Sequence, residues 1–352
     1  MVIGVCGYSF SGSGAVVDFL KQWGKIDVLD SFEFSLVYAP DGLNDLKYHL
    51  CDNFSKYLTS AVAIERFRRF FYRTFINNKG NRKIRQKLKS ALDDYIDSLI
   101  DVSWTGYGGS DIYLYSGFFY KNRLLDMMLY KIHSHLISKL PFRNKKKHLP
   151  YHKIEISIEP RLFMEKTKKF IRTILQELGF AKEVVVIDQA FSPNFPNNSL
   201  SFFDNARGII VDRDPRDLYV LAKKYLHPKG LGTQIPTDDV NDFIKYFQKT
   251  RTNGDKCNND RLIKIQFEDL IYKYDETKEK IRSFCNLDFE FNEFSFFDPH
   301  LSANNTLLFL QDSTFLEETK IIEKELSDYL YDFSNCNSYE RKGKMFLDKP
   351  NE

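Results

Sequence analysis

The sequence predicts an α/β fold with a central parallel sheet flanked by helices and a large, mostly α-helical insertion. Three observations predict it. Short apolar runs rich in β-branched residues occur at 2–7, 183–189 and 209–212. Turns containing Gly, Ser or Pro follow these runs, and segments with helical apolar spacing lie between them. Runs that are apolar throughout are typical of parallel strands, because helices cover both faces of a parallel sheet.

Composition limits the class of protein. The chain has 352 residues, of which 43% are hydrophobic, enough for a single domain over 1–352 with an insertion at 38–180 and a C-terminal tail at 334–352. A net charge of +3 gives no reason to expect nucleic acid as a partner. No apolar run is long enough to span a bilayer, and the five cysteines form no CxxC pair. We therefore expect a cytoplasmic protein with no transmembrane segment and no metal site; oligomeric state does not follow from the sequence.

The first predicted strand runs into a loop of Gly and Ser that opens a helix. Glycines allow a tight turn, and the first N–H groups of a helix point outward at its positive end, which suits an anion. We expect the anion to bind at Ser11, Gly12, Ser13, Gly14 and Ala15. Neither of two common nucleotide-binding patterns fits this loop. The pattern of nucleoside triphosphatases requires a lysine where this chain has Ser13, and the dinucleotide-binding pattern requires a glycine where it has Val17.

A second strand-to-helix turn follows the apolar run at 209–212. Asp214 and Pro215 are residues that commonly begin a helix. Arg213, at the exit of the strand, offers a rigid fork of donors for phosphate oxygens, and we expect Arg216 to pair with Asp217 and hold the turn.

Three stretches, taken in order, resemble the sulfotransferase family. Residues 8–14 (YSFSGSG) resemble its 5′-phosphosulfate loop, residues 211–217 (VDRDPRD) its 3′-phosphate motif, and residues 262–270 (LIKIQFEDL) the strand and helix that follow. The resemblance implies a P-loop-like sheet and transfer of a sulfuryl group from 3′-phosphoadenosine 5′-phosphosulfate (PAPS), without a metal, to a hydroxyl, with a carbohydrate such as a cell-surface or capsular glycan as the expected acceptor. It places the 3′-phosphate at Arg213.

Two carboxylates are candidates for the base that takes the acceptor's proton. Glu33 occupies a place comparable to the catalytic glutamate of carbohydrate and tyrosine sulfotransferases. Asp188 ends the apolar run at 183–189, and because the carboxyl ends of parallel strands meet at one edge, we expect it and Gln189 near the loop and Arg213. Cytosolic sulfotransferases have a histidine after the comparable strand, but this chain has none there.

The chain departs from the family's motifs at three places, one of which is Phe267, where the family has a tyrosine before the residues that match Glu268 and Asp269. Phe10 stands where the loop usually carries Lys or Arg, and Leu221 stands where the 3′-phosphate motif usually has serine. Either Lys223, Lys224 or Arg341 supplies the missing cation, or the protein binds the nucleotide without good catalysis. A P-loop kinase with a degenerate loop is the remaining alternative.

The predicted insertion carries two basic clusters, at 66–73 and 143–148, which are either solvated surfaces or contacts for an anionic acceptor. An aromatic, Gly-rich loop at 104–111 either lines an acceptor cleft with Trp104 and Tyr107 or packs on the core. Beyond the insertion, the Gly- and Pro-rich segment at 226–239 is a candidate lid, and the basic residues at 341–344 are either a solvated tail or a clamp for the 3′-phosphate.

Overall fold

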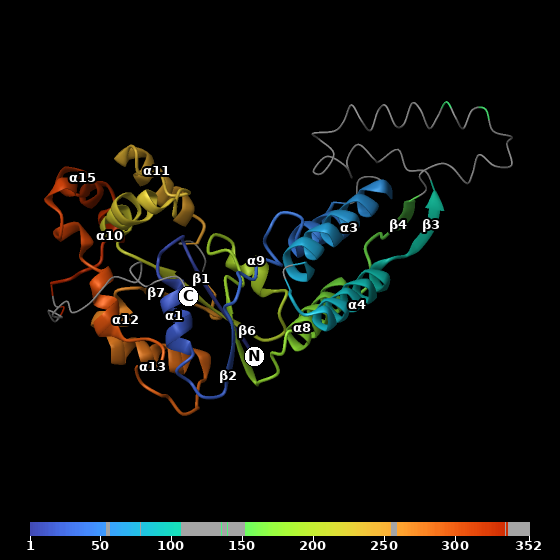
Figure 1. The fold of residues 1–352 in the computed structure, drawn as a ribbon, viewed down its shortest axis with the longest axis horizontal. Helices are drawn as coiled ribbons and strands as arrows, with labels where there is room; N and C mark the ends of the chain where they lie inside the picture. Colours follow the sequence, from blue (N-terminus) through green and yellow to red (C-terminus); the bar gives the residue numbers. More distant parts are fainter. Residues whose placement is uncertain are drawn as a thin grey trace. The chain divides into compact units, whose positions relative to one another are not determined.

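A computed structural model describes residues 1–53, 57–77, 79–106, 152–254 and 259–334, together with residues 135, 139 and 336. The chain divides into two compact units (Figure 1). Unit 1 comprises Met1–Val37 and Gly179–Glu352, and unit 2 comprises Tyr38–Leu178. The predicted 143–148 cluster, Tyr107, Arg341 and the other residues of 341–344 lie outside the described residues.

Unit 1 contains a five-stranded sheet with the order β2-β5-β1-β6-β7, in which every neighbouring pair is parallel. The strands are β1 (Val2–Gly7), β2 (Ile26–Leu29), β5 (Val184–Asp188), β6 (Ala206–Asp212) and β7 (Leu262–Gln266). The predicted α/β fold with a central parallel sheet is therefore confirmed. Because β1 is the middle strand, its carboxyl end lies between those of β5 and β6, with Val5 beside Asp188 and Gly7 beside Val211.

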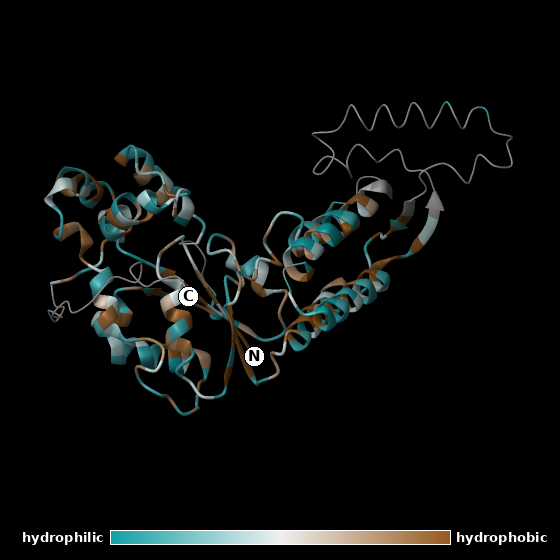
Figure 2. Cartoon of the chain, in the orientation of Figure 1, coloured by the Kyte–Doolittle hydropathy of each residue, from teal (hydrophilic) through white to brown (hydrophobic). Residues whose placement is uncertain are grey.

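In the described part of unit 1, six α-helices pack in two hydrophobic cores, and they form two separate groups in Figure 1. One core joins one face of the sheet to α1 (Ser13–Leu20), α12 (Asp269–Tyr272) and α13 (Tyr274–Cys285). The other joins α10 (Pro215–Val220), α11 (Val240–Arg251) and α15 (Leu316–Glu325). The remaining helical segments of unit 1 are α9 (Pro196–Leu200), α14 (Pro299–Ser302), η4 (Leu221–Leu226), η5 (His227–Lys229), η6 (Ala303–Asn305), η7 (Leu308–Leu310), η8 (Ser313–Phe315) and η9 (Ser327–Tyr329). Figure 2 shows the strands as mostly hydrophobic and the helices as two-faced, as burial on one face requires.

Unit 2 is mostly helical where it is described, in agreement with the predicted insertion. Its elements are α2 (Leu43–Lys47), η1 (Tyr48–Asp52), α3 (Tyr57–Phe71), η2 (Tyr72–Ile76), α4 (Arg82–Leu99), α8 (Phe163–Glu177), and β3 (Val102–Gly106) paired antiparallel with β4 (His152–Ile156). Its core is aromatic, with the Tyr95 and Phe170 rings stacked 4.3 Å apart. Trp104 belongs to β3 and not to a loop, and is 42% exposed. The antiparallel pairing of β3 with β4 was not predicted, because Trp104 was assigned to a loop on account of the glycines that follow it.

The first basic cluster of unit 2 lies on α3 and is largely neutralised. Arg66 binds Asp41, Arg68 binds Glu155 at 2.8 Å, and Arg69 binds its helical neighbour Glu65 at 2.8 Å. These pairs support the interpretation of a solvated, ion-paired helix face over that of an anion-binding surface. Among the described helices of the whole chain, none is long and apolar enough to cross a membrane.

Candidate functional site

The loop between β1 and α1 has a shape that depends on its glycines. Gly12 precedes α1 with φ at 100°, a value that favours glycine, and a Cβ added there would lie 2.5 Å from the Phe267 ring. A Cβ on Gly7 would overlap the Ser11 hydroxyl. The backbone at Ser9 and Phe10 is also left-handed, with φ of 42° and 57°. The packing of these residues therefore determines the path of the loop before any ligand binds.

Ser11 holds this loop against β6. Its hydroxyl accepts a hydrogen bond from the Tyr8 amide at 3.0 Å and donates one to the Val211 carbonyl at 2.7 Å, and the residue is 1% exposed. The hydroxyl of Ser11 is thus committed to the fold. The hydroxyl of Ser13, in contrast, is only partly buried and accepts a hydrogen bond from the Gln189 side chain at 3.0 Å.

The N–H groups at the start of α1 are available to a ligand. Within the described part of the chain, those of Gly12, Ser13 and Gly14 have no acceptor, whereas the Ala15 N–H donates to the Gly12 carbonyl at 3.0 Å. Gly14 is exposed, and a Cβ added to it would meet nothing within 4 Å. Free donors at the positive end of a helix, with open space above them, form a seat for an anion.

The end of β5 brings both predicted bases close to this loop. Gln189 has φ at 52° and donates its backbone N–H to the Val5 carbonyl at 2.8 Å. Phe34 donates its N–H to the Asp188 carbonyl at 3.1 Å, which brings the neighbouring Glu33 to the same edge. One carboxylate oxygen of Asp188 is buried without a hydrogen-bond partner among the described residues. Burial, with the negative charge of the exposed Glu33 as a second cause, raises the pKa of Asp188 to about 6.

Arg213 leaves β6 on the other side of β1 and is 2% exposed. Its guanidinium lies 5.0 Å from the centre of the Phe267 ring, and one terminal nitrogen donates to the Asn305 carbonyl. The Nε of Arg213 is buried and has no partner among the residues described. Because the Phe267 ring contacts both Gly12 and Arg213, the loop and the arginine lie at the same edge of the sheet and share one neighbour.

The turn after Arg213 is held differently from what the sequence suggested. Arg216 pairs with Asp214 at 2.8 Å, and Asp217 instead accepts the backbone N–H groups of Leu307 and Leu308 at 2.7 and 2.6 Å. The predicted Arg216–Asp217 pair is therefore wrong. Asp217 lies nearly a hundred residues from its partners, so no local pattern reveals this contact.

The two lysines predicted to replace the cation missing from the loop are both held in ion pairs. Lys223 is paired with Glu318 and Lys224 with Asp312, each at 2.7 Å. Phe10, which occupies the cation's place in the sequence, packs against the hydrophobic core around α10 and α11.

Arg251, the last residue of α11, was not predicted as a site residue; it is fully buried, and its guanidinium lies 4.4 Å from the Tyr8 ring centre. One signal was available. Phe243, Phe247 and Arg251 recur every four residues on the buried face of this helix, where an arginine is unexpected.

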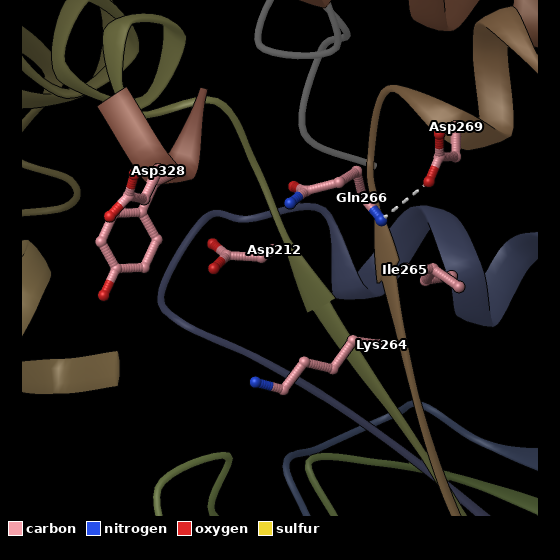
Figure 3. A pocket seen from close by; sticks show the side chains of 7 residues that line it. Asp212, Lys264, Ile265, Gln266, Asp269 and Asp328 are labelled. Carbon is pink, nitrogen blue, oxygen red and sulfur yellow. Dashed lines mark hydrogen bonds between the residues drawn. The ribbon is translucent and has the colours of Figure 1, made fainter. Parts of the chain in front are cut away.

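A cavity of about 370 Å³ lies beside the edge strand β7 (Figure 3). It is lined by Asp212, Lys264, Ile265, Gln266, Asp269, Asp328 and Tyr329. This cavity is separate from the proposed anion site at Gly12, Ser13 and Gly14, because its lining includes no residue of the β1 loop and neither Asp188 nor Arg213. Among the described residues, no group of three or more His, Cys, Asp or Glu is placed to hold a metal ion.

Comparison with known proteins gives structural neighbours but no sequence relatives. No family model and no curated protein matches the chain. The sulfotransferase domain from the curacin biosynthetic pathway is 15% identical, with 94% of this chain and 98% of that chain covered and a TM-score of 0.39. The sulfotransferase domain from the Synechococcus PCC 7002 olefin synthase is 14% identical, with 93% and 88% covered and a TM-score of 0.35. Sulfotransferase STF9 from Mycobacterium avium is 12% identical, with 96% and 78% covered and a TM-score of 0.37. All three are sulfotransferases, and the similarity concerns the fold and no particular residue of the site.

Proposed function

We propose that this chain is a sulfotransferase that moves a sulfuryl group from PAPS to a hydroxyl, with a carbohydrate as the expected acceptor. The proposal rests on two features at the same edge of the sheet. The N–H groups of Gly12, Ser13 and Gly14 have no acceptor among the described residues, and one carboxylate oxygen of Asp188 has no hydrogen-bond partner among them. The five cysteines without a CxxC pair support a cytoplasmic location.

The reaction needs one bond to form and one to break. The acceptor oxygen bonds to sulfur, the bond from sulfur to the bridging phosphate oxygen breaks, and adenosine 3′,5′-bisphosphate leaves. The loop N–H groups and the positive end of α1 would stabilise the 5′-phosphosulfate and the charge that develops on the leaving phosphate. The unpartnered Nε–H of Arg213 is the donor assigned to the 3′-phosphate.

We assign the acceptor's proton to Asp188 in preference to Glu33. A base works best when its pKa is near the working pH, and burial raises the pKa of Asp188 to about 6, whereas Glu33 is exposed. Glu33 and Asp30 add negative charge around Asp188. A neutral glycan therefore fits this side of the site better than an acidic glycan.

A second candidate function is binding of the same nucleotide without useful turnover. It is favoured by Phe10, which leaves the loop without its usual cation, and by the ion pairs that already hold Lys223 and Lys224. Sulfuryl transfer and simple binding make different demands, because only transfer requires charge to be stabilised on the leaving oxygen.

Thermal-shift titration followed by a transfer assay tests the proposal. Adenosine 3′,5′-bisphosphate should raise the melting midpoint, since a ligand that binds only the folded state stabilises it, and ATP with magnesium should not. Radiolabelled sulfate transfer to a panel of neutral and acidic glycans should then show turnover, with neutral acceptors preferred. A shift with ATP and none with the bisphosphate would favour a kinase and reject the donor. Binding of the bisphosphate without turnover on any acceptor would favour the second candidate.

A further inference from the structure

Arg251 is a charged side chain buried in the middle of unit 1. Its guanidinium carbon lies 3.3 Å from the centre of the Phe247 ring and 4.4 Å from that of the Tyr8 ring. Nε and Nη2 donate to the Asp212 carboxylate at 2.8 and 2.7 Å, and Nη1 donates to the Thr250 hydroxyl at 3.1 Å. The side chain of Arg251 is 0% exposed and that of Asp212 is 17% exposed.

Asp212 and Tyr8 each belong to one half of the proposed donor site. Asp212 is the last residue of β6, and its carboxylate also accepts the Arg213 backbone N–H at 2.8 Å. Tyr8 is the first residue of the loop after β1, and its N–H is bonded to the Ser11 hydroxyl. Arg251 therefore contacts, with one planar group, the residue before the proposed 3′-phosphate ligand and the residue that begins the proposed phosphosulfate loop.

The fold itself gives little reason for a buried ion pair here. Removing two charges from water costs about as much as their attraction returns, and apolar residues of similar size often stabilise a protein equally well. What a bidentate arginine pair adds is geometry, since two parallel hydrogen bonds fix both the distance and the plane of the carboxylate. Asp212 and the Tyr8 ring are consequently held at a defined separation.

We propose that Arg251 is a positioning residue for the donor: it sets the spacing between the phosphosulfate loop and Arg213 by binding Asp212 and stacking on Tyr8. This inference rests on the proposed function, because the spacing matters only if one ligand spans both places. A ligand with a single phosphate group would not depend on it, whereas a nucleoside carrying phosphates on both its 3′ and 5′ oxygens would.

The test separates positioning from stability with a compensated pair of substitutions. Arg251→Met alone leaves the Asp212 carboxylate without its partner and should destabilise the fold. Arg251→Met combined with Asp212→Asn removes both charges and should recover most of the wild-type melting midpoint. We expect this double variant to bind adenosine 3′,5′-bisphosphate at least tenfold more weakly by calorimetry, while its affinity for inorganic sulfate at the loop stays within a factor of two or three of wild type.

A second variant covers the case in which the double variant does not fold. Tyr8→Leu leaves the Arg251–Asp212 ion pair intact and removes only the ring on which the guanidinium stacks, and it should also weaken bisphosphate binding. Arg251→Lys, which keeps a charge without the planar fork, should give an intermediate affinity. Arg282→Met is the matched control, because Arg282 is 43% exposed and pairs only with Glu279 and Asp288 among the described residues.

The outcomes are distinguishable. If wild-type protein does not bind the bisphosphate, the proposed function and this inference both fail. If wild type binds and the folded variants at Arg251 or Tyr8 bind equally well, the inference alone is overturned. If sulfate and bisphosphate affinities fall together, Arg251 supports only the loop, and its proposed role in spacing is wrong.

Discussion

The polar groups on the two sides of the carboxyl end of β1 differ in whether other protein groups bind them. On the loop side, which we define as Gly12, Ser13, Gly14 and Asp188, backbone N–H groups and a carboxylate oxygen have no partner among the described residues. On the exit side, defined as Arg213, Asp214, Asp217 and Glu268, the charged groups are buried, and carboxylates or backbone groups hold most of them.

This difference suits one side to ligand binding and the other to holding the structure. N–H groups at an accessible edge that no protein group occupies can exchange water for an anion, so the loop side is suited to a ligand. Buried charges that satisfy one another hold the structure, and removing one exposes the others to a full desolvation penalty. On the exit side the pKa of Glu268 is raised well above its usual value by burial and by the charge of Asp214. Arg213 is part of the exit side, where its charge offsets those of the neighbouring carboxylates, but its Nε has no partner among the described residues and can bind a ligand.

The largest effect is expected at Asp188. Asp188→Asn should lower sulfate-transfer turnover by about 10²–10⁴-fold, because an amide cannot take the acceptor's proton. The wild-type rate should also fall as the pH is lowered through about 6, where Asp188 becomes protonated. Turnover at saturating donor across this pH range is the measurement. Glu33→Gln is the comparison variant, and a greater loss in that variant would transfer the role of base to Glu33.

The next effect is expected at Arg213. Arg213→Ala should lower the free energy of unfolding by about 3–5 kcal/mol, because Asp217 and Glu268 lose the positive charge beside them. Arg213→Lys keeps that charge and should preserve most of the stability measured by urea denaturation. Its affinity for adenosine 3′,5′-bisphosphate should nevertheless fall by about tenfold, since a lysine lacks the guanidinium fork. Wild-type affinity in Arg213→Lys would remove Arg213 from the donor site.

A smaller effect is expected at Gly14. Gly14→Ala adds a methyl group that meets no protein atom within 4 Å, so the fold should be unchanged or stabilised by up to about 1 kcal/mol. A phosphosulfate bound at the loop would contact that methyl group, and bisphosphate affinity should fall by about tenfold. Gly80→Ala is the control, because a Cβ at Gly80 also meets nothing within 4 Å. Equal affinities in the two variants would argue against an anion above Gly14.

The smallest effect is the pH dependence of stability that Asp188 contributes. Its folded-state pKa is raised above the unfolded value of 3.8 to about 6, so the folded protein holds this proton more tightly. The stability contributed by the protonated carboxyl is complete below the unfolded pKa and is lost as the pH rises through about 6. Asp188→Asn should therefore melt about 2 °C above wild type at neutral pH and match it near pH 4. A constant difference across this range would mean that Asp188 is not desolvated.

Much of the fold follows from local patterns. The continuous apolar runs at 2–7 and 183–189 predicted buried parallel strands, because only strands covered on both faces are apolar throughout. The structure confirms both strands within one sheet. The roles assigned to Ser11, Arg213, Glu33 and Asp188 stay predictions.

By itself, the sequence determined where strands turn into helices and which turns carry glycine, serine or arginine, because backbone preferences and apolar periodicity act over a few residues. Only the tertiary structure decided which buried charges meet. Asp217 reaches the N–H groups of Leu307 and Leu308, and Arg251 reaches both Asp212 and Tyr8, through contacts between segments far apart in the chain. The choice of partner for a buried charge depends on which groups remain unsatisfied after the whole chain has packed, and no local stretch of sequence contains that information.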